Sequence, residues 1–188
     1  MTNVFIAISV LLQLISPLVY TRAVLRGQAK PHRTTRFVLL VLTTLATISL
    51  FISGDRVAVW LAGVSMLQGI LVFTLSLKYG MGGWSKIDIS CLIIALVGII
   101  MWQITKQPII ALYFAIGADL VGMIPTIIKT YRLPKTEIYM FFLMDSIAAT
   151  FNMLALKSWT IEQFSYPIYI MIINAFMVLL IVRPKKIS

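Results

Sequence analysis

Two carboxylates interrupt stretches of this sequence that are otherwise apolar. Asp119 lies near the middle of residues 107–128, and Asp145 lies within residues 138–156. At the centre of a bilayer an ionised carboxylate costs about 3 kcal/mol on insertion scales, so such a residue usually faces a cavity or a partner. We therefore expect Asp119 to be a proton or cation site, with a structural hydrogen bond to a neighbouring helix as the alternative.

Asp145 begins a small polar stripe in a segment rich in Met, Phe and Leu. Ala148, Ala149 and Asn152 follow it at helical spacing and share its face. Small and polar side chains on one face either line a pathway or allow a close contact between helices. Both interpretations stay open for Asp145 and Asn152.

Two amide side chains occupy matching positions in two apolar stretches. When residues 56–78 are aligned with residues 162–183, Gln68 falls on Asn174. Each amide offers donors and an acceptor in a medium where no water competes, so leaving it unpaired would be costly. We expect the pair either to contact a substrate or to form a mutual hydrogen bond that joins two halves of the chain.

An aromatic residue and two prolines could shape a pathway around these polar groups. Trp60 lies about two turns before Gln68 on the same face, which makes it a candidate outer gate or stacking platform, with a membrane-interface anchor as the alternative. Pro17 and Pro125 interrupt two apolar stretches at matching positions. A proline removes one backbone hydrogen bond and lets a helix bend, so we expect either paired hinges or helix ends near the interface.

Seven apolar runs carry these residues. They span residues 1–21, 37–54, 57–77, 89–105, 107–128, 138–156 and 163–182. Hydrophobic residues make up 60% of the chain and charged residues 12%, and about 20 apolar residues suffice to cross a bilayer. The sequence therefore predicts an all-α integral membrane protein with seven transmembrane helices and no soluble domain.

The same runs argue against an enzyme. They contain no histidine, and the one cysteine, Cys91, can form neither an internal disulfide nor a metal cluster. His32 lies in a loop, where we expect it to be solvated and not a metal ligand. We accordingly expect no catalytic residue, no cofactor and no bound metal.

Basic residues alternate between the two sides of the predicted spans. Of the 16 lysines and arginines, all but three follow runs one, three and five or lie in the C-terminal tail. The positive-inside rule then places the N-terminus outside and the C-terminus in the cytoplasm. This topology also accounts for the net charge of +10 without a nucleic-acid partner.

The order of the runs indicates two halves. We divide the chain into a first three-helix repeat at residues 1–78, a linker helix at residues 79–106 and a second three-helix repeat at residues 107–188. The extra helix gives both repeats the same orientation, as in transporters built from parallel repeats. The segment GMGGW, from Gly80 to Trp84, fits a mobile link between the halves or an ordinary interfacial turn.

Pro17 and Pro125 are each followed within five residues by a base near the end of runs one and five. This feature resembles the PQ-loop signature. Together with the 3+1+3 plan, it resembles a diverged, bacterial-type member of the SWEET and PQ-loop (MtN3-like) superfamily of seven-helix transporters. In SWEET-like carriers a pair of asparagines on the third and seventh helices holds the substrate near the midplane. The resemblance implies that role for Asn174 and, by position, for Gln68.

These expectations favour a transporter that moves a small polar solute by alternating access through a central cavity between the repeats. Proton coupling would use Asp119 or Asp145, and acids in the cavity favour cations, amino acids or proton-linked substrates over neutral sugars. The alternative is a seven-helix receptor, sorting or binding protein on the same fold without net transport. We expect a multi-pass protein of the cell (inner) membrane, whose partners are the solute, protons and the lipid bilayer; association into a homo-oligomer stays open.

Overall fold

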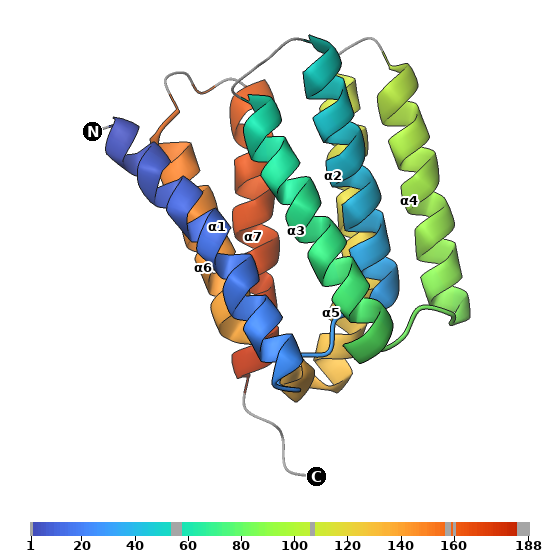
Figure 1. Cartoon of the computed structure of the whole chain (residues 1–188). Coiled ribbons are helices and arrows are strands. Elements are labelled where there is room, and N and C mark those ends of the chain that lie inside the picture. Colours follow the sequence, from blue (N-terminus) through green and yellow to red (C-terminus); the bar gives the residue numbers. More distant parts are fainter. Residues whose placement is uncertain (1, 54–57, 106–107, 157–158, 160, 184–188) are drawn as a thin grey trace. The chain divides into compact units, whose positions relative to one another are not determined.

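The computed structural model describes residues 2–53, 58–105, 108–156, 159 and 161–183 (Figure 1). Within these residues the chain forms seven α-helices and one short 3-10 helix. The helices are α1 (Thr2–Leu25), α2 (Arg33–Ser53), α3 (Ala58–Tyr79), α4 (Lys86–Ile104), α5 (Pro108–Arg132), η1 (Pro134–Thr136), α6 (Tyr139–Leu154) and α7 (Ile161–Val182). The prediction of an all-α chain with one helix for each apolar run is confirmed.

Three of these helices contain segments that are long and apolar enough to cross a membrane. The segments are Val4–Leu25 in α1, Tyr113–Arg132 in α5 and Phe164–Val182 in α7, and α6 is a shorter apolar helix. Large apolar side chains are also exposed along the helices, with Leu18 64% and Leu179 66% exposed. A surface this apolar suits a lipid environment, so the chain has the features of a helical membrane protein.

The helices form two compact units. Unit 1 contains Met1–Ala29 and Ile127–Ser188, which bring together α1, the end of α5, η1, α6 and α7. Helix α6 packs along both α1 and α7, and Figure 1 shows α1 lying beside α6. Tyr20 and Phe141 join α1 to α6 with ring centroids 4.5 Å apart. The Ser146 hydroxyl joins α6 to α7 by donating to the Met171 carbonyl at 3.1 Å.

Unit 2 contains Lys30–Thr126, with α2, α3, α4 and most of α5. Its core is made of small and β-branched side chains: Val38 from α2, Ala95 and Ile99 from α4, and Ala118 from α5. Small residues allow such helices to approach closely, which is how apolar helices associate where hydrophobic burial offers no driving force. Gly122 extends this contact, because a Cβ built there would lie 2.6 Å from Cγ1 of Val38.

Some of the helices that pack together come from different predicted repeats. Helix α1 packs on α6, and α5 contacts α2 through Gly122 and Val38. In each case the first helix of one predicted repeat contacts the second helix of the other. The second and third helices of each repeat pack together, as α2 with α3 and α6 with α7. The repeats are defined by chain order and the units by packing, so the division at residues 78 and 106 stays a prediction.

The segment from Gly80 to Trp84 is tied to the loop before α2. Met81 donates its backbone N–H to the Pro31 carbonyl at 3.0 Å and accepts from the Arg33 N–H at 3.2 Å. Gly82 adopts a positive φ of 72°, and a Cβ there would lie 2.1 Å from the His32 ring. The segment from Gly80 to Trp84 and the loop from Pro31 to Arg33 are thus held together by backbone hydrogen bonds, and we call them the interlocked turn. Its glycines allow close approach to His32.

His32 is buried, so the prediction that it is solvated is wrong. Only 6% of the residue is exposed, and its Nε2 lies 3.4 Å from Oδ1 of Asp88 at the start of α4. The reason is the interlocked turn: Gly82 has no side chain to hold the ring away, and Asp88 supplies an acceptor. Sequence proximity to other bases gave no sign of this burial.

Candidate functional site

Helix α1 presents a polar face inside an otherwise apolar segment. Ser9, Ser16 and Tyr20 are all buried on it, although most of the large aliphatic residues of α1 are exposed. Their spacing of seven and four residues places them on one side of an α-helix. The carboxylates of Asp145 and Glu137 meet this face. The sequence does not reveal the face, because each of its residues is unremarkable by itself.

Ser16 and Asp145 form the central contact of unit 1. The Ser16 hydroxyl donates to Oδ1 of Asp145 at 2.5 Å, which joins α1 to α6. Ser16 is fully buried, Asp145 is half-buried, and Pro17 follows Ser16 directly. A short O–H···O⁻ bond of this kind is stronger than a neutral one. The structure thus contains the close helix contact that was one alternative for Asp145, while the pathway role stays a prediction.

A second carboxylate, Glu137, lies at the end of the same α1 face. Its Oε1 forms a salt bridge with Nζ of Lys129 and accepts from the Tyr20 hydroxyl at 3.2 Å. The side chains of Lys129 and Glu137 are 4% and 0% exposed. Removing one member of a buried ion pair leaves an uncompensated charge, so each member depends on the other. The one signal for this pair in the sequence is that Glu137 is the single acid among the bases that follow run five.

Glu137 also has one oxygen that makes no hydrogen bond. Its Oε2 is buried, and no partner for it occurs among the residues that the structure describes. Buried polar atoms are nearly always satisfied. Oε2 of Glu137 is therefore an exception: a buried acceptor that no described residue satisfies.

The other residues predicted for unit 1 differ in their surroundings. Asn174 on α7 is buried, and its Nδ2 donates to the Ile170 carbonyl of the same helix at 2.8 Å. Ala148 and Ala149 are buried on α6, whereas Asn152 is exposed. The small stripe that begins at Asp145 is therefore buried for one turn and then reaches the surface.

Unit 2 holds the remaining predicted residues. Asp119 on α5 is 7% exposed, and Gln68 on α3 is half-buried. Trp60 lies in α3, but its side chain is outside the described residues. The roles predicted for these three residues stay predictions.

A polar contact stands next to Pro125, as one does next to Pro17. The Thr35 hydroxyl on α2 donates to the Gly122 carbonyl at 2.7 Å, and the Thr126 hydroxyl donates to Thr35 Oγ1 at 2.9 Å. Both threonines are fully buried. The boundary between the two units falls directly after Thr126, whereas Pro17 lies inside unit 1. At both predicted hinges, a hydroxyl next to the proline bonds to a neighbouring helix. The hinges differ in that Pro125 lies at the boundary between the units and Pro17 does not.

The turn at His32 contains the clearest electrostatic effect outside the apolar runs. Oδ2 of Asp88 accepts the backbone N–H groups of Gly83 and Ser85 at 3.0 Å each, and Ser85 Oγ accepts the Asp88 N–H, which forms a capping box for α4. Burial by itself would raise the pKa of Asp88. The hydrogen bonds with Ser85 and Gly83 and the nearby His32 outweigh burial and hold that pKa below its usual range.

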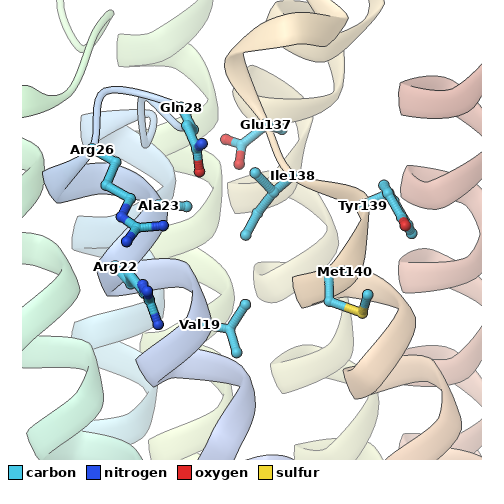
Figure 2. A pocket seen from close by; sticks show the side chains of 9 residues that line it. All are labelled: Val19, Arg22, Ala23, Arg26, Gln28, Glu137, Ile138, Tyr139 and Met140. Carbon is cyan, nitrogen blue, oxygen red and sulfur yellow. The ribbon is translucent and has the colours of Figure 1, made fainter.

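Unit 1 also contains a pocket of about 400 Å³ where α1 ends and α6 begins (Figure 2). Its lining residues are Val19, Arg22, Ala23, Arg26, Gln28, Glu137, Ile138, Tyr139 and Met140. None of the residues predicted to bind substrate lines this pocket. It is therefore separate from the Ser16–Asp145 contact.

The polar groups described in each unit are of kinds that can form hydrogen bonds, and a carboxyl group can also take up a proton. Carboxylates, hydroxyls and amides provide donors and acceptors inside helices that are otherwise apolar. Comparisons of the chain with models of protein families, with curated proteins and with solved structures found no match.

Proposed function

We propose that this chain is a membrane transporter that moves a small polar solute by alternating access. All seven helices would span the membrane, with the N-terminus outside and the C-terminus in the cytoplasm. The observation that carries the proposal is the Ser16–Asp145 contact: a half-buried carboxylate in an apolar helix, held by a hydroxyl next to a helix-bending proline.

The Asp145 carboxylate is energetically costly within an apolar helix, which supports a functional role for it. An acid inside a membrane helix is expensive, and a hydrophobic residue would serve packing as well or better. Protonation changes what Asp145 can do, because a neutral carboxyl can donate as well as accept. A cycle that binds and releases a proton, a cation or an ammonium group would use this change.

The same kind of helix contact occurs twice in the chain, which also supports transport. α1 packs on α6 beside Pro17, and α5 contacts α2 beside Pro125. In both places a hydroxyl next to the proline bonds to the other helix. Two helix pairs with a proline at matching places are the kind of elements that rocking transporters could use. Pro125 directly precedes the residue that ends unit 2, which suits a hinge.

The predicted binding residues complete the proposal. Gln68 and Asn174 would contact the solute, as the resemblance to SWEET-like carriers implies. Asp119 or Asp145 would provide the coupling acid. Because acids favour positively charged or zwitterionic solutes, we propose amino acids and organic cations as substrate classes ahead of neutral sugars.

The test is a counterflow assay on the full chain in liposomes. Vesicles are loaded with an unlabelled amino acid, an organic cation or a monosaccharide, and the labelled compound is added outside. Transient accumulation of label above equilibrium for one class supports transport. Specific binding of a compound in thermal-shift titrations, without counterflow of that compound, would instead favour a receptor or sorting protein. The transport proposal fails if neither binding nor counterflow exceeds that of protein-free vesicles for any class.

A further inference from the structure

We propose that the pocket between the end of α1 and the start of α6 binds a phosphate group carried on a glycerol-like body. This inference is independent of the transport proposal, since the pocket shares no residue with the predicted solute site. Two chemical features of the pocket carry it: a pair of arginines on one wall, and an apolar surface on the other.

Arg22 and Arg26 supply the anion-binding wall. Arg22 lies in the last turn of α1, and Arg26 follows the helix directly, with its backbone N–H donating to the Arg22 carbonyl at 3.0 Å. Figure 2 shows both side chains on the α1 side of the pocket, across from Ile138 and Met140. Among the described residues neither guanidinium has an acidic partner within salt-bridge distance. Like charges four residues apart repel each other, so an anion between them relieves the repulsion. Guanidinium groups bind phosphate through two parallel hydrogen bonds.

The acid in the pocket does not oppose this binding. Glu137 lines the pocket, but Lys129 neutralises its charge in a buried salt bridge. The Glu137 side chain is 0% exposed, so it presents no free charge to a ligand. Gln28 adds an exposed amide at the same end of the pocket. The pocket thus offers two cations for a phosphate and one amide for a neighbouring hydroxyl.

The rest of the lining is apolar. Val19, Ile138 and Met140 extend from the polar end along α1 and α6 (Figure 2). A volume of about 400 Å³ is several times that of a phosphate ion alone, so the site suits a larger, partly apolar molecule. Such a molecule is either the headgroup and glycerol of an anionic phospholipid or a soluble phosphate ester.

Two arms of one experiment distinguish these sources on the full chain in micelles. In the first, native mass spectrometry measures the affinity for dioleoyl-phosphatidylglycerol, with dioleoylglycerol as the matched lipid that lacks phosphate. In the second, the unfolding midpoint is measured against sn-glycerol 3-phosphate, with sodium chloride at equal ionic strength as the control. Both arms compare the wild type with the double variant Arg22→Gln, Arg26→Gln.

The matched control is the double variant Arg132→Gln, Lys135→Gln. It removes the same charge from exposed residues of unit 1 that do not line the pocket. Without ligand, we expect all three proteins to unfold at the same temperature, because none of the four side chains is buried.

We expect the pocket variant to lose affinity for the phosphate-bearing ligand by about tenfold or more, which corresponds to the loss of charge-assisted hydrogen bonds, while the control variant changes by about twofold or less. A selective loss for phosphatidylglycerol identifies a lipid site, and a selective loss of stabilisation by glycerol 3-phosphate identifies a soluble ester. The proposal is overturned if both variants lose affinity equally, or if the pocket variant loses none in either arm.

Discussion

The hydroxyl of Ser16 and the carboxylate of Asp145 lie 2.5 Å apart although 129 residues separate them in the chain. This one bond joins α1, at the residue before Pro17, to the middle of α6. The bond places Asp145 at a contact between α1 and α6. A change in the protonation of Asp145 would therefore alter a hydrogen bond that joins the two helices.

We predict that Ser16→Ala destabilises the protein by about 1–2 kcal/mol, because the half-buried Asp145 carboxyl loses the hydrogen bond from α1. Ser9→Ala is the matched control. Ser9 is also buried on the same face, but among the described residues its side chain bonds only to Gln13 of its own helix. Denaturant unfolding in micelles measures both changes. Equal losses for the two variants would mean that the bond between α1 and α6 contributes nothing of its own.

The salt bridge between Lys129 and Glu137 gives a second prediction. Lys129→Met should cost about 3–5 kcal/mol, since the Glu137 carboxylate stays buried without its cation. Adding Glu137→Met should recover a large part of that loss, because the unpaired charge disappears. Tyr20→Phe should cost only about 1 kcal/mol. A double-mutant cycle from unfolding curves is the measurement, and strictly additive losses for the two methionine variants would refute the pairing.

Gly122 and Gly117 give a matched pair on one helix. A Cβ at Gly122 would collide with Val38, whereas a Cβ at Gly117 would meet nothing within 4 Å. We expect Gly122→Ala to destabilise by about 1–3 kcal/mol through overpacking. Gly117→Ala should be neutral or stabilise by up to about 1 kcal/mol, because alanine favours the helix. Thermal unfolding separates the two, and a harmless Gly122→Ala would show that α5 does not approach α2 this closely.

The ionisation of Asp88 should make the stability of the folded protein depend on pH. Its pKa is lower in the folded protein than its ordinary value, so its contribution to stability is fully present at neutral pH. That contribution is lost as the pH falls below about 4 and the carboxyl becomes protonated. The stability difference between the wild type and Asp88→Asn should therefore be largest at pH 7 and shrink towards pH 3. Unfolding midpoints at pH 7, 5 and 3.5 test this; a difference that stays constant would exclude the ionised cap.

Much of the helical architecture could be predicted from local sequence. The apolar runs are long enough to form helices by themselves, and bases and prolines mark their ends. The helices extend a few residues beyond the runs, as α1 does through Arg22 and α2 does by starting at Arg33, because charged residues continue a helix without being apolar.

The contacts between helices could not be predicted in the same way. The bond from Ser16 to Asp145 and the burial of His32 against Asp88 depend on residues far apart in the chain. The residues next to Ser16 and His32 in the sequence give no indication of these distant partners. Gln68, Asn174, Asp119 and Trp60 were chosen by type and position, and their roles remain predictions.

The most direct test of the transport account is solute-driven proton movement in liposomes that contain the pH dye pyranine. The wild type, Asp119→Asn and Asp145→Asn are compared after a solute found by counterflow is added outside at symmetric pH. We predict that the solute changes the internal pH with the wild type, and that at least one of the two variants abolishes the change while still binding the solute. The account is contradicted if no solute of any tested class crosses the membrane faster with the wild-type protein than without it.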